Sequence, residues 1–387
     1  MQGLPWWIIL ATAALVIGQL FFALHAMRLL LGDEELPEFR PTVAPFITVV
    51  VPARNEEAAI GGLLMDLRAQ DYPANRFEVI VVDDGSEDNT RQVVMEHMDP
   101  AWLALALDGE EGKKAAIEKA VRHSGGDVVV VTDADARCGP LRLQSIARVW
   151  QRDPFDLLLM PIAVAKDGSR LQALQANEQL GFMAVAAASA YAGHAAIANG
   201  ANMAFRRSTF ELLGGFHEHR HIASGDDMFL LRSMQAANKN VVYAAAPEVL
   251  MTVRSERHIS GFVQQRLRWA GKMLRGGTGT SSIIPALALM VPVLLWTSTL
   301  LLFADPVDRH LQDGWSIAVP IPVLVPLLLW LGWVLPIVVL AQTMGTRTGQ
   351  RTSPIGLALD LVLFSIYAPV IAVLSLFTRS TWKGRRV

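Results

Sequence analysis

Long apolar runs mark both ends of this 387-residue chain. Residues 5–31 are almost entirely apolar, and three further apolar runs cover residues 283–304, 317–342 and 355–377. A helix of about 20 apolar residues spans the hydrocarbon core of a bilayer, so each run is long enough to cross a membrane. The first run has no basic segment before it and no small-residue cleavage site after it, which favours a retained anchor over a cleaved signal peptide.

The region between the apolar ends alternates short β-branched runs with helix-like stretches. Strands are predicted at residues 46–51, 77–82, 103–107 and 127–132, and helices at 57–70, 88–98, 113–123 and 140–152. This alternation is typical of a parallel sheet with helices on both faces. Ligands bind such sheets outside the carboxyl ends of the strands. We therefore expect a nucleotide-binding α/β domain.

The expected organisation has three parts. Residues 1–32 form a transmembrane anchor, residues 33–280 the α/β domain, and residues 281–387 a membrane region with a basic tail. A composition of 52% hydrophobic and 18% charged residues fits a soluble domain joined to membrane segments. The net charge of −2 gives no sign of bulk nucleic-acid binding. The only cysteine, Cys138, leaves no partner for an intrachain disulfide.

Two rules place the basic tail on different sides of the membrane. If the α/β domain is cytoplasmic, three C-terminal crossings put the tail outside, whereas its four basic residues (Arg379, Lys383, Arg385 and Arg386) favour the cytoplasm. The second C-terminal run contains several prolines, so part of it could be re-entrant or broken. We give the charge rule more weight than the count of crossings.

Polar residues follow three of the predicted strands, in VPARNEE (51–57), DDGSEDNT (83–90) and TDADA (132–136). Turns are naturally rich in Asp, Asn and Gly, which explains one such cluster but not three. Carboxylates at a nucleotide site can accept hydrogen bonds from base or ribose, or hold a hard cation against a diphosphate. Asp133 and Asp135, alternate residues at a strand end, suit the second use and predict bound Mn²⁺ or Mg²⁺ acting as a Lewis acid.

The ordered set of motifs resembles the family 2 glycosyltransferases, which have the GT-A fold. The landmarks are VPARNEE, VVDDGSEDNT, Gly112-Lys113, DADA, GANMAFRR (200–207), GDD (225–227) and QQRLRW (264–269). The resemblance implies an inverting hexosyltransferase that uses a nucleotide-sugar donor. It also implies an α/β, GT-A type, parallel-rich sheet with flanking helices, joined to an N-terminal transmembrane helix and a C-terminal transmembrane bundle.

The resemblance further implies a role for each matching residue. Asp133 and Asp135 hold metal and diphosphate. Asp227 occupies the position of the catalytic base, in a Gly-Asp-Asp triplet where relatives often have Thr-Glu-Asp. Asp226 lies beside it, and Arg268 offers a planar fork of donors to the diphosphate. The donor pocket is expected to include Pro52, Arg54, Asn55, Glu56, Asp83, Asp84, Lys113, Asp133, Gln265 and Trp269.

Structural roles compete with several of these assignments. Arg268-Trp269 also fits an interfacial membrane anchor, although Gln265 precedes it at the spacing of the Gln-x-x-Arg-Trp motif. Asp226 and Asp227 also fit an N-cap pair. Lys113-Lys114 fits a solvated helix start as well as it fits a donor contact. The histidines of HEHRH (217–221) are spaced for metal ligation, but we favour a solvated loop.

Two stretches predict where the acceptor binds. Residues 178–198 are Ala-rich and apolar, and residues 257–275 are basic and aromatic, as in interfacial helices. Such helices would hold the active site against the cytoplasmic leaflet of a bacterial inner or plasma membrane. We therefore expect a lipid acceptor, as in the ceramide and carotenoid glycosyltransferases that this chain resembles.

Two other functions stay open at this point. A processive polysaccharide synthase also resembles the chain, although three C-terminal runs are few to line a polymer tunnel. A catalytically inactive membrane scaffold of the same fold is disfavoured by the presence of Asp133, Asp135, Asp227 and Arg268 together. The oligomeric state is not predicted.

Overall fold

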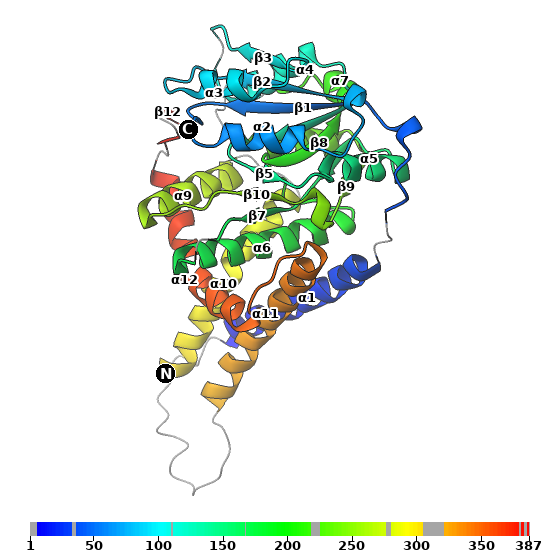
Figure 1. Cartoon of the computed structure of the whole chain (residues 1–387). Coiled ribbons are helices and arrows are strands. Elements are labelled where there is room, and N and C mark those ends of the chain that lie inside the picture. Colours follow the sequence, from blue (N-terminus) through cyan, green and yellow to red (C-terminus); the bar gives the residue numbers. More distant parts are fainter. Residues whose placement is uncertain are drawn as a thin grey trace, which may run out of the picture.

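The computed structural model places an α/β domain above a group of long helices (Figure 1). It describes residues 6–32, 36–109, 111–166, 168–217, 225–275, 280–304, 321–378, 381–382 and 385–386. Helix α1 (Trp6–Gly32) precedes the α/β domain, and α10 (Thr280–Ala304), α11 (Ile321–Arg347) and α12 (Pro354–Phe377) follow it.

A seven-stranded sheet of order β3-β2-β1-β4-β8-β6-β9 forms the centre of the domain. Strands β1 to β4 pair in parallel, and β8 runs antiparallel to both of its neighbours. The runs of Val and Ile in β1, β2 and β4 are buried because helices cover both faces of the sheet. The strands are β1 (Ile47–Ala53), β2 (Phe77–Asp83), β3 (Leu103–Ala106), β4 (Val128–Thr132), β6 (Leu157–Leu159), β8 (Asn202–Arg206) and β9 (Val241–Tyr243).

The four helices expected between the first strands are all present, as are the four expected strands. They are α2 (Ile60–Arg68), α3 (Thr90–His97), α4 (Lys113–His123) and α5 (Arg142–Arg152). Two further helices follow β8 along the chain, α7 (Arg207–Leu212) and α8 (Asp226–Ala236). Short 3-10 helices occupy Pro41–Val43, Ala74–Arg76 and Pro247–Val249.

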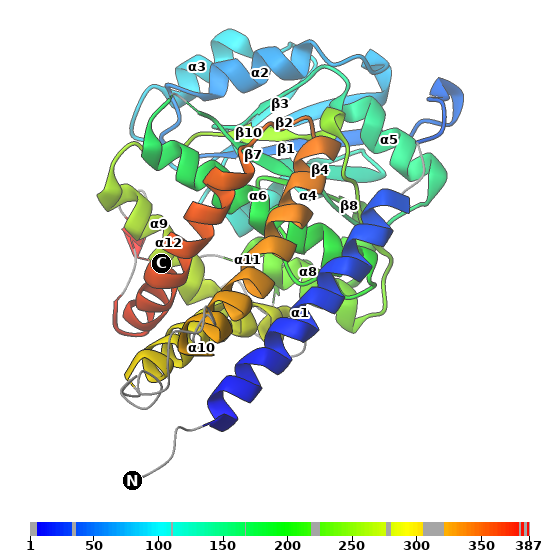
Figure 2. The same ribbon diagram turned by 90° about the horizontal axis from the view of Figure 1, so that it is seen from below.

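A second layer separates the large sheet from the long helices. It contains a three-stranded sheet of order β5-β10-β7, formed by β5 (Arg137–Cys138), β10 (Met251–Val253) and β7 (Ile162–Val164), and helix α6 (Arg170–Tyr191). Helix α6 contacts β7 and β9 as well as α1, α11 and α12. Figure 2, viewed from below, shows these three long helices passing beneath it.

Residues 178–198, which the sequence predicts as an interfacial helix, include the C-terminal part of helix α6 (Arg170–Tyr191). Helix α6 begins after Ser169, whose Oγ accepts a hydrogen bond from the Gln172 N–H at 3.2 Å, and it ends at Tyr191. Most of its side chains are buried between the two layers. The many alanines allow the neighbouring helices to approach closely, and the position of α6 relative to a membrane surface stays a prediction.

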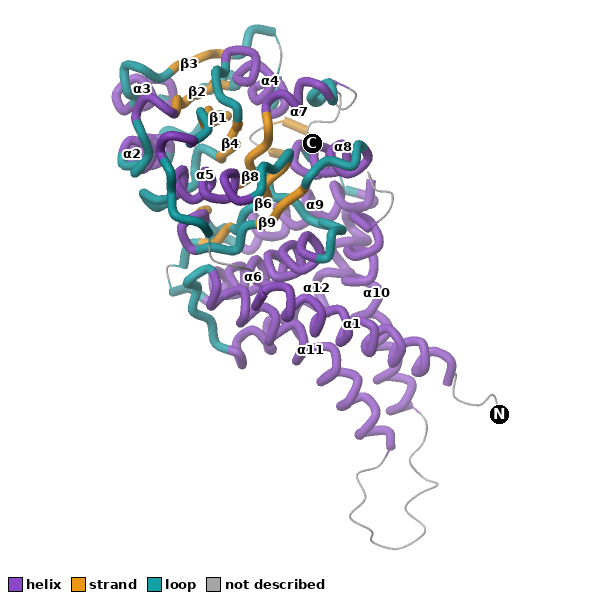
Figure 3. The backbone as a smooth tube through the Cα atoms, turned by 90° about the vertical axis from the view of Figure 1, so that its right-hand side faces the viewer, coloured by secondary structure: helices purple, strands orange, loops and turns teal. Residues whose placement is uncertain are grey.

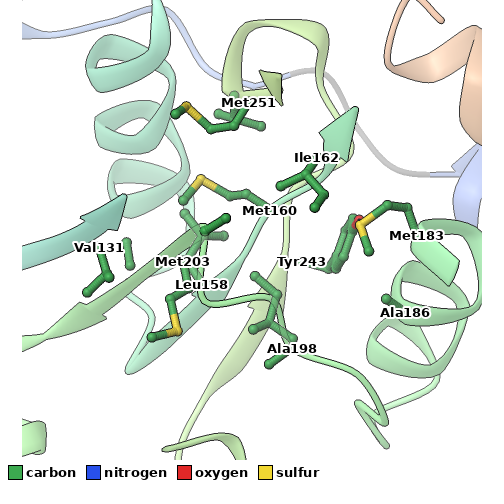
Figure 4. Packing of buried hydrophobic residues seen from close by; sticks show 14 of the residues in the cluster. Val131, Leu158, Met160, Ile162, Met183, Ala186, Ala198, Met203, Tyr243 and Met251 are labelled. Carbon is green, nitrogen blue, oxygen red and sulfur yellow. The ribbon is translucent and has the colours of Figure 1, made fainter. Parts of the chain in front are cut away.

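The apolar core continues from the sheet into α6. Met203 on β8, Met251 on β10 and Tyr243 on β9 belong to one cluster, and the Tyr243 hydroxyl donates to Met183 Sδ of α6 at 3.8 Å (Figure 4). All four side chains are buried. Methionine adapts to irregular gaps, which suits a junction between two sheets and a helix. The α/β domain and α6 therefore form one packed body.

Four of the described helices are long and apolar enough to cross a membrane by length and composition. They lie where the sequence predicted them, one before the α/β domain and three after it. Helix α11 is continuous through Pro326 and Pro336, so the expectation of a broken or re-entrant segment is wrong for the described residues. Polar pairs join neighbouring helices, such as the Thr12 and Ser298 hydroxyls at 3.0 Å.

The C-terminal end of the chain lies on the same side of the molecule as the α/β domain, at the level of helix α9 (Ile259–Arg275), as Figures 1 and 3 show. Its last described residues form a short hairpin of Thr381–Trp382 and Arg385–Arg386. Arg379 and Lys383 lie outside the described residues. This placement agrees with the charge rule, and the cytoplasmic orientation itself stays a prediction.

Candidate active site

The polar segments that follow β1 and β2 interlock at the carboxyl edge of the sheet. The Arg54 Nη1 donates to the Asp84 backbone oxygen at 2.8 Å. The Asn55 N–H donates to Ser86 Oγ at 3.0 Å, and the Glu56 N–H donates to Thr90 Oγ1 at 2.7 Å. Asn55 has a φ of 50°, a left-handed conformation that Asn tolerates better than most residues. Pro52 lies in β1, opposite Val82 of β2. The structure thus brings the first two predicted clusters together.

Asp83 and Asp84 are both buried at this edge, 7% and 4% exposed. Asp83 Oδ2 accepts a hydrogen bond from Arg91 Nε at 2.6 Å. Asp84 Oδ1 accepts one from the Gly112 N–H at 3.0 Å, where Gly112 has a φ of 94°. Asp84 therefore fixes the loop that leads into Lys113. The expected contact of these carboxylates with a nucleoside stays a prediction.

Lys113 lies at the centre of the site. Its Nζ donates to Asp133 Oδ1 at 2.6 Å and to the Gly200 backbone oxygen at 3.0 Å, and it lies 3.4 Å from Asp226 Oδ2. Burial alone would lower the pKa of this ammonium, but Asp133, Asp226 and Asp227 together raise the pKa above its ordinary value. Lys113 therefore stays charged and joins the two groups of acids.

The solvated helix start considered for Lys113-Lys114 is wrong. Lys113 is engaged as described, and the Lys114 side chain is also buried, with its Nζ 4.2 Å from the centre of the Phe229 ring. Both lysines point into the protein because the first turn of α4 faces the segments that carry Gly200 and Asp226.

Asp133 and Asp135 follow β4 at the same edge, and the Asp133 side chain is 39% exposed. No cluster of three or more His, Cys, Asp or Glu side chains that could hold a metal ion occurs within the described ranges. Two carboxylates nevertheless fit Mg²⁺ or Mn²⁺, because such ions at diphosphate sites take one or two carboxylates together with substrate oxygens. His217 is exposed, while His219 and His221 of the HEHRH motif lie outside the described residues.

Asp226 and Asp227 begin helix α8, whose N-cap is Gly225 with a φ of 92°. The expectation that the two acids form an N-cap pair is therefore wrong, and both lie in the first turn, where the helix dipole favours negative charge. Asp226 is 5% exposed and faces Lys113. Asp227 is less buried, and its Oδ2 accepts a hydrogen bond from the Gly200 N–H at 3.2 Å. Of the two side chains, that of Asp227 is the more accessible.

Gly200 contributes to the site in a way that its motif alone did not reveal. Its carbonyl accepts from Lys113 and its N–H donates to Asp227, so its backbone bridges the two. A Cβ at this position would lie 2.8 Å from Asp226 Oδ2 and 2.9 Å from Lys113 Nζ. A side chain at position 200 would therefore displace the charged ends of Asp226 and Lys113 from their present positions.

Helix α9, which packs against α12 and α10, carries the QQRLRW motif. Arg266 forms a buried ion pair with Glu178 of α6, and its guanidinium lies 4.3 Å from the Phe262 ring centre and 4.5 Å from that of Trp269. Gln265 Oε1 accepts a hydrogen bond from Arg266. Two of the three predicted motif residues therefore contact Arg266, which the sequence did not single out. The interfacial-anchor role considered for Arg268-Trp269 stays a prediction, and Trp269 also packs against the Arg266 guanidinium.

Arg268 lies within electrostatic reach of the acids. Burial lowers the pKa of its guanidinium, while Glu256 and Asp133 act in the opposite direction. Arg268 is thus the residue of the motif whose charge interacts with the Asp133 carboxylate after β4. Its charge is retained because an arginine does not lose its proton in proteins.

Comparison with known families matches residues 48–214 to the model described as Glycosyl transferase family 2. The match covers the motifs from VPARNEE to GANMAFRR. The triplet at 225–227 and QQRLRW at 264–269 lie beyond it. The family resemblance expected from the motifs is therefore confirmed for this part of the chain.

Curated relatives share this part of the chain. The beta-monoglucosyldiacylglycerol synthase of Synechocystis sp. is 30% identical over 148 residues, which are 37% of this chain and 30% of that protein. The undecaprenyl-phosphate 4-deoxy-4-formamido-L-arabinose transferase of Pseudomonas syringae is 30% identical over 117 residues, 29% of this chain and 35% of that protein. The matched segment thus spans only about a third of the length of these relatives.

A solved structure resembles nearly the whole chain. The mannosyltransferase PcManGT from Pyrobaculum calidifontis, in complex with GDP-Man and Mn²⁺, aligns with a TM-score of 0.56 and 22% identity, covering 93% of this chain and 98% of that one. This likeness supports the fold. The expected GT-A type α/β architecture with one N-terminal and three C-terminal apolar helices is confirmed.

Proposed function

We propose, from the Glycosyl transferase family 2 domain that this chain carries, that the protein moves a sugar from a nucleotide-diphosphate donor to a membrane lipid. The observation that carries the proposal is the cluster around Lys113. It joins Asp133, at the edge where a donor would bind, to Asp226 and Gly200 on the acceptor side. One compact site therefore holds groups for both substrates.

The donor half of the site consists of the β1, β2 and β4 edges together with α9. Asp133 and Asp135 would hold Mg²⁺ or Mn²⁺, which when bound would supply Lewis-acid stabilisation of the diphosphate leaving group. The Mn²⁺ in the complex of PcManGT supports this choice of ion. Arg268 adds a fixed positive charge toward the same phosphates. The segments at 52–56 and 83–84 enclose the nucleoside.

Asp227 acts as the general base. Its carboxylate takes the proton of the acceptor hydroxyl while that oxygen attacks the anomeric carbon of the donor sugar. The new glycosidic C–O bond forms as the bond from the anomeric carbon to the diphosphate breaks, and the nucleoside diphosphate leaves from the opposite face. A single displacement of this kind inverts the anomeric configuration.

A lipid acceptor fits the position of the site above the apolar helices. Helix α9 packs against α12, the last candidate membrane span, and its first residue Ile259 is 72% exposed. Relatives described as a glucosyldiacylglycerol synthase and an undecaprenyl-phosphate transferase are named for lipid acceptors. We infer an anchor at residues 1–32, a catalytic domain at 33–280 facing the cytoplasm, and a membrane region at 281–387 of a bacterial inner membrane.

The experiment that tests this function follows the label from the donor. Purified protein in lipid, with Mn²⁺ or Mg²⁺ and a bacterial lipid extract, is incubated with a panel of labelled nucleotide sugars. We expect label in the organic phase, and its loss in the Asp227→Asn variant. Label in a large water-soluble or insoluble polymer would support a polysaccharide synthase instead. Absence of transfer from every donor would favour the inactive scaffold.

Asp135→Ala is expected to weaken donor binding in the presence of Mn²⁺ by about 100-fold, because loss of even an outer partner of a metal ligand costs about 10–100-fold. Without metal, the variant and the wild type should bind the nucleotide sugar equally weakly. Isothermal titration with and without Mn²⁺ measures both affinities. Asp108→Ala is the matched control, because this carboxylate is exposed and pairs only with Lys119 among the described contacts. Equal affinities of the Asp135 variant and the wild type in Mn²⁺ would remove Asp135 from the metal site.

A further inference from the structure

Arg142, the first residue of α5, is a fully buried arginine, with 0% of its surface exposed. Its Nη2 donates to Thr132 Oγ1 and to Asn202 Oδ1, both at 2.9 Å. Within the described ranges its Nε and Nη1 have no hydrogen-bond partner, and no carboxylate pairs with it. A buried cation without a carboxylate is costly, because desolvation opposes it and nothing nearby neutralises it. An apolar side chain would fill this space at lower cost.

The two acceptors of Arg142 stand opposite each other in the sheet. Thr132 and Asn202 are register partners in the antiparallel ladder of β4 and β8, at the end of β4 and the start of β8. The next residue after Thr132 is Asp133. Two residues before Asn202 is Gly200, whose backbone contacts Lys113 and Asp227. The guanidinium therefore lies where the donor segment and the acceptor segment leave the sheet.

Asn202 is fixed from its other side as well. Its Nδ2 donates to the backbone oxygens of Pro161 at 2.7 Å and Val249 at 2.8 Å. The amide thus has one orientation, in which its oxygen faces Arg142. The planar fork of an arginine can contact two acceptors at once, which a lysine ammonium on a flexible stem does less well.

We propose that Arg142 is a positioning residue, which clamps Thr132 to Asn202 and thereby sets the spacing between Asp133 and Asp227. This inference rests on the proposed function for its catalytic consequence. The structural part of the inference concerns only how rigidly the two segments at residues 132–136 and 199–203 are held. The two parts can be measured separately.

The test replaces Arg142 with methionine, which fills the space without a charge or a donor. Because a buried uncompensated charge is removed, the unfolding temperature should not fall. We expect kcat for sugar transfer to drop by about 100-fold, as small misplacements of reacting groups produce, with a smaller change in the KM for the donor. Amide hydrogen exchange should rise in the segments at 132–136 and 199–203.

Three further variants make the result specific. Arg148→Met is the matched control on the same helix, because Arg148 donates to the backbone oxygens of Leu36 and Pro37, away from the site, and should leave kcat and the exchange of both segments unchanged. Arg142→Lys should recover only part of kcat. Thr132→Val, which keeps the shape and removes one acceptor, should change kcat in the same direction as Arg142→Met and covers the case in which the latter does not fold.

The hydrogen-exchange result separates this inference from the proposed function. If the wild type transfers no sugar, the proposed function fails, and faster exchange in both segments of Arg142→Met still supports the clamp. Unchanged exchange in both segments would overturn the clamp whatever the activity. A wild-type kcat in Arg142→Met would also overturn the clamp, and so would a wild-type kcat in Arg142→Lys. In either case, transfer would not depend on a guanidinium that contacts both strands.

Discussion

The Asp227→Asn variant is expected to lose sugar transfer, with kcat falling by about 10²–10⁴-fold, because an amide cannot take the proton of the acceptor hydroxyl. Its fold should persist, since the Asn side chain has nearly the same shape and its oxygen can still accept a hydrogen bond from the Met228 or Gly200 N–H. Nucleotide binding should change little for the same reason. Steady-state transfer kinetics and donor titration measure the two quantities on one preparation.

Asp226→Asn is the informative comparison. The Asp226 carboxylate is buried and faces Lys113, so its loss should disturb the lysine and the donor side, with a larger effect on donor affinity than Asp227→Asn shows. The opposite pattern, with Asp227→Asn near the wild-type rate and Asp226→Asn inactive, would transfer the base role to Asp226. Such a pattern would require the acceptor to approach from the Lys113 side.

The features that the sequence predicted are those encoded by local pattern. Uninterrupted Val and Ile runs identified β1, β2 and β4, because a strand buried on both faces has no polar alternation. The carboxyl ends of parallel strands meet at one edge, so the polar residues after these strands were expected to gather there, and they do. The long apolar runs identified the candidate membrane helices in the same way.

The features that it did not predict depend on contacts between distant segments. Glu178 and Arg266 are 88 positions apart, and nothing in either local sequence indicates that the two side chains meet. Arg142 reads as an ordinary basic residue near a helix start, and only the fold shows it buried between two strands. For α6, an Ala-rich apolar composition is shared by interfacial and buried helices, so only its neighbours in the structure distinguish them.

The buried ion pair of Glu178 and Arg266 leads to the second large expected effect. Glu178→Ala leaves the Arg266 guanidinium buried without its partner, which should cost about 3–5 kcal/mol in the stability of the packed region. Helix α9 carries Arg268 and Trp269, so its loosening should also reduce kcat/KM. Thermal unfolding in detergent and transfer kinetics measure these effects. Asp360→Asn is the matched control, because it weakens the ion pair between Asp360 of α12 and Arg170 of the same helix α6, whose side chain is 63% exposed and can be solvated.

The double variant Glu178→Met, Arg266→Met distinguishes a stabilising pair from a functional one. Removal of both charges leaves no unpaired buried ion, so stability should return close to that of the wild type. Activity should not return, because the guanidinium that lies between Phe262 and Trp269 and binds Gln265 is gone. If the double variant recovers both properties, Arg266 serves only the packing of α9 on α6. If Glu178→Ala behaves like Asp360→Asn in both measurements, the ion pair does not hold α9 in place.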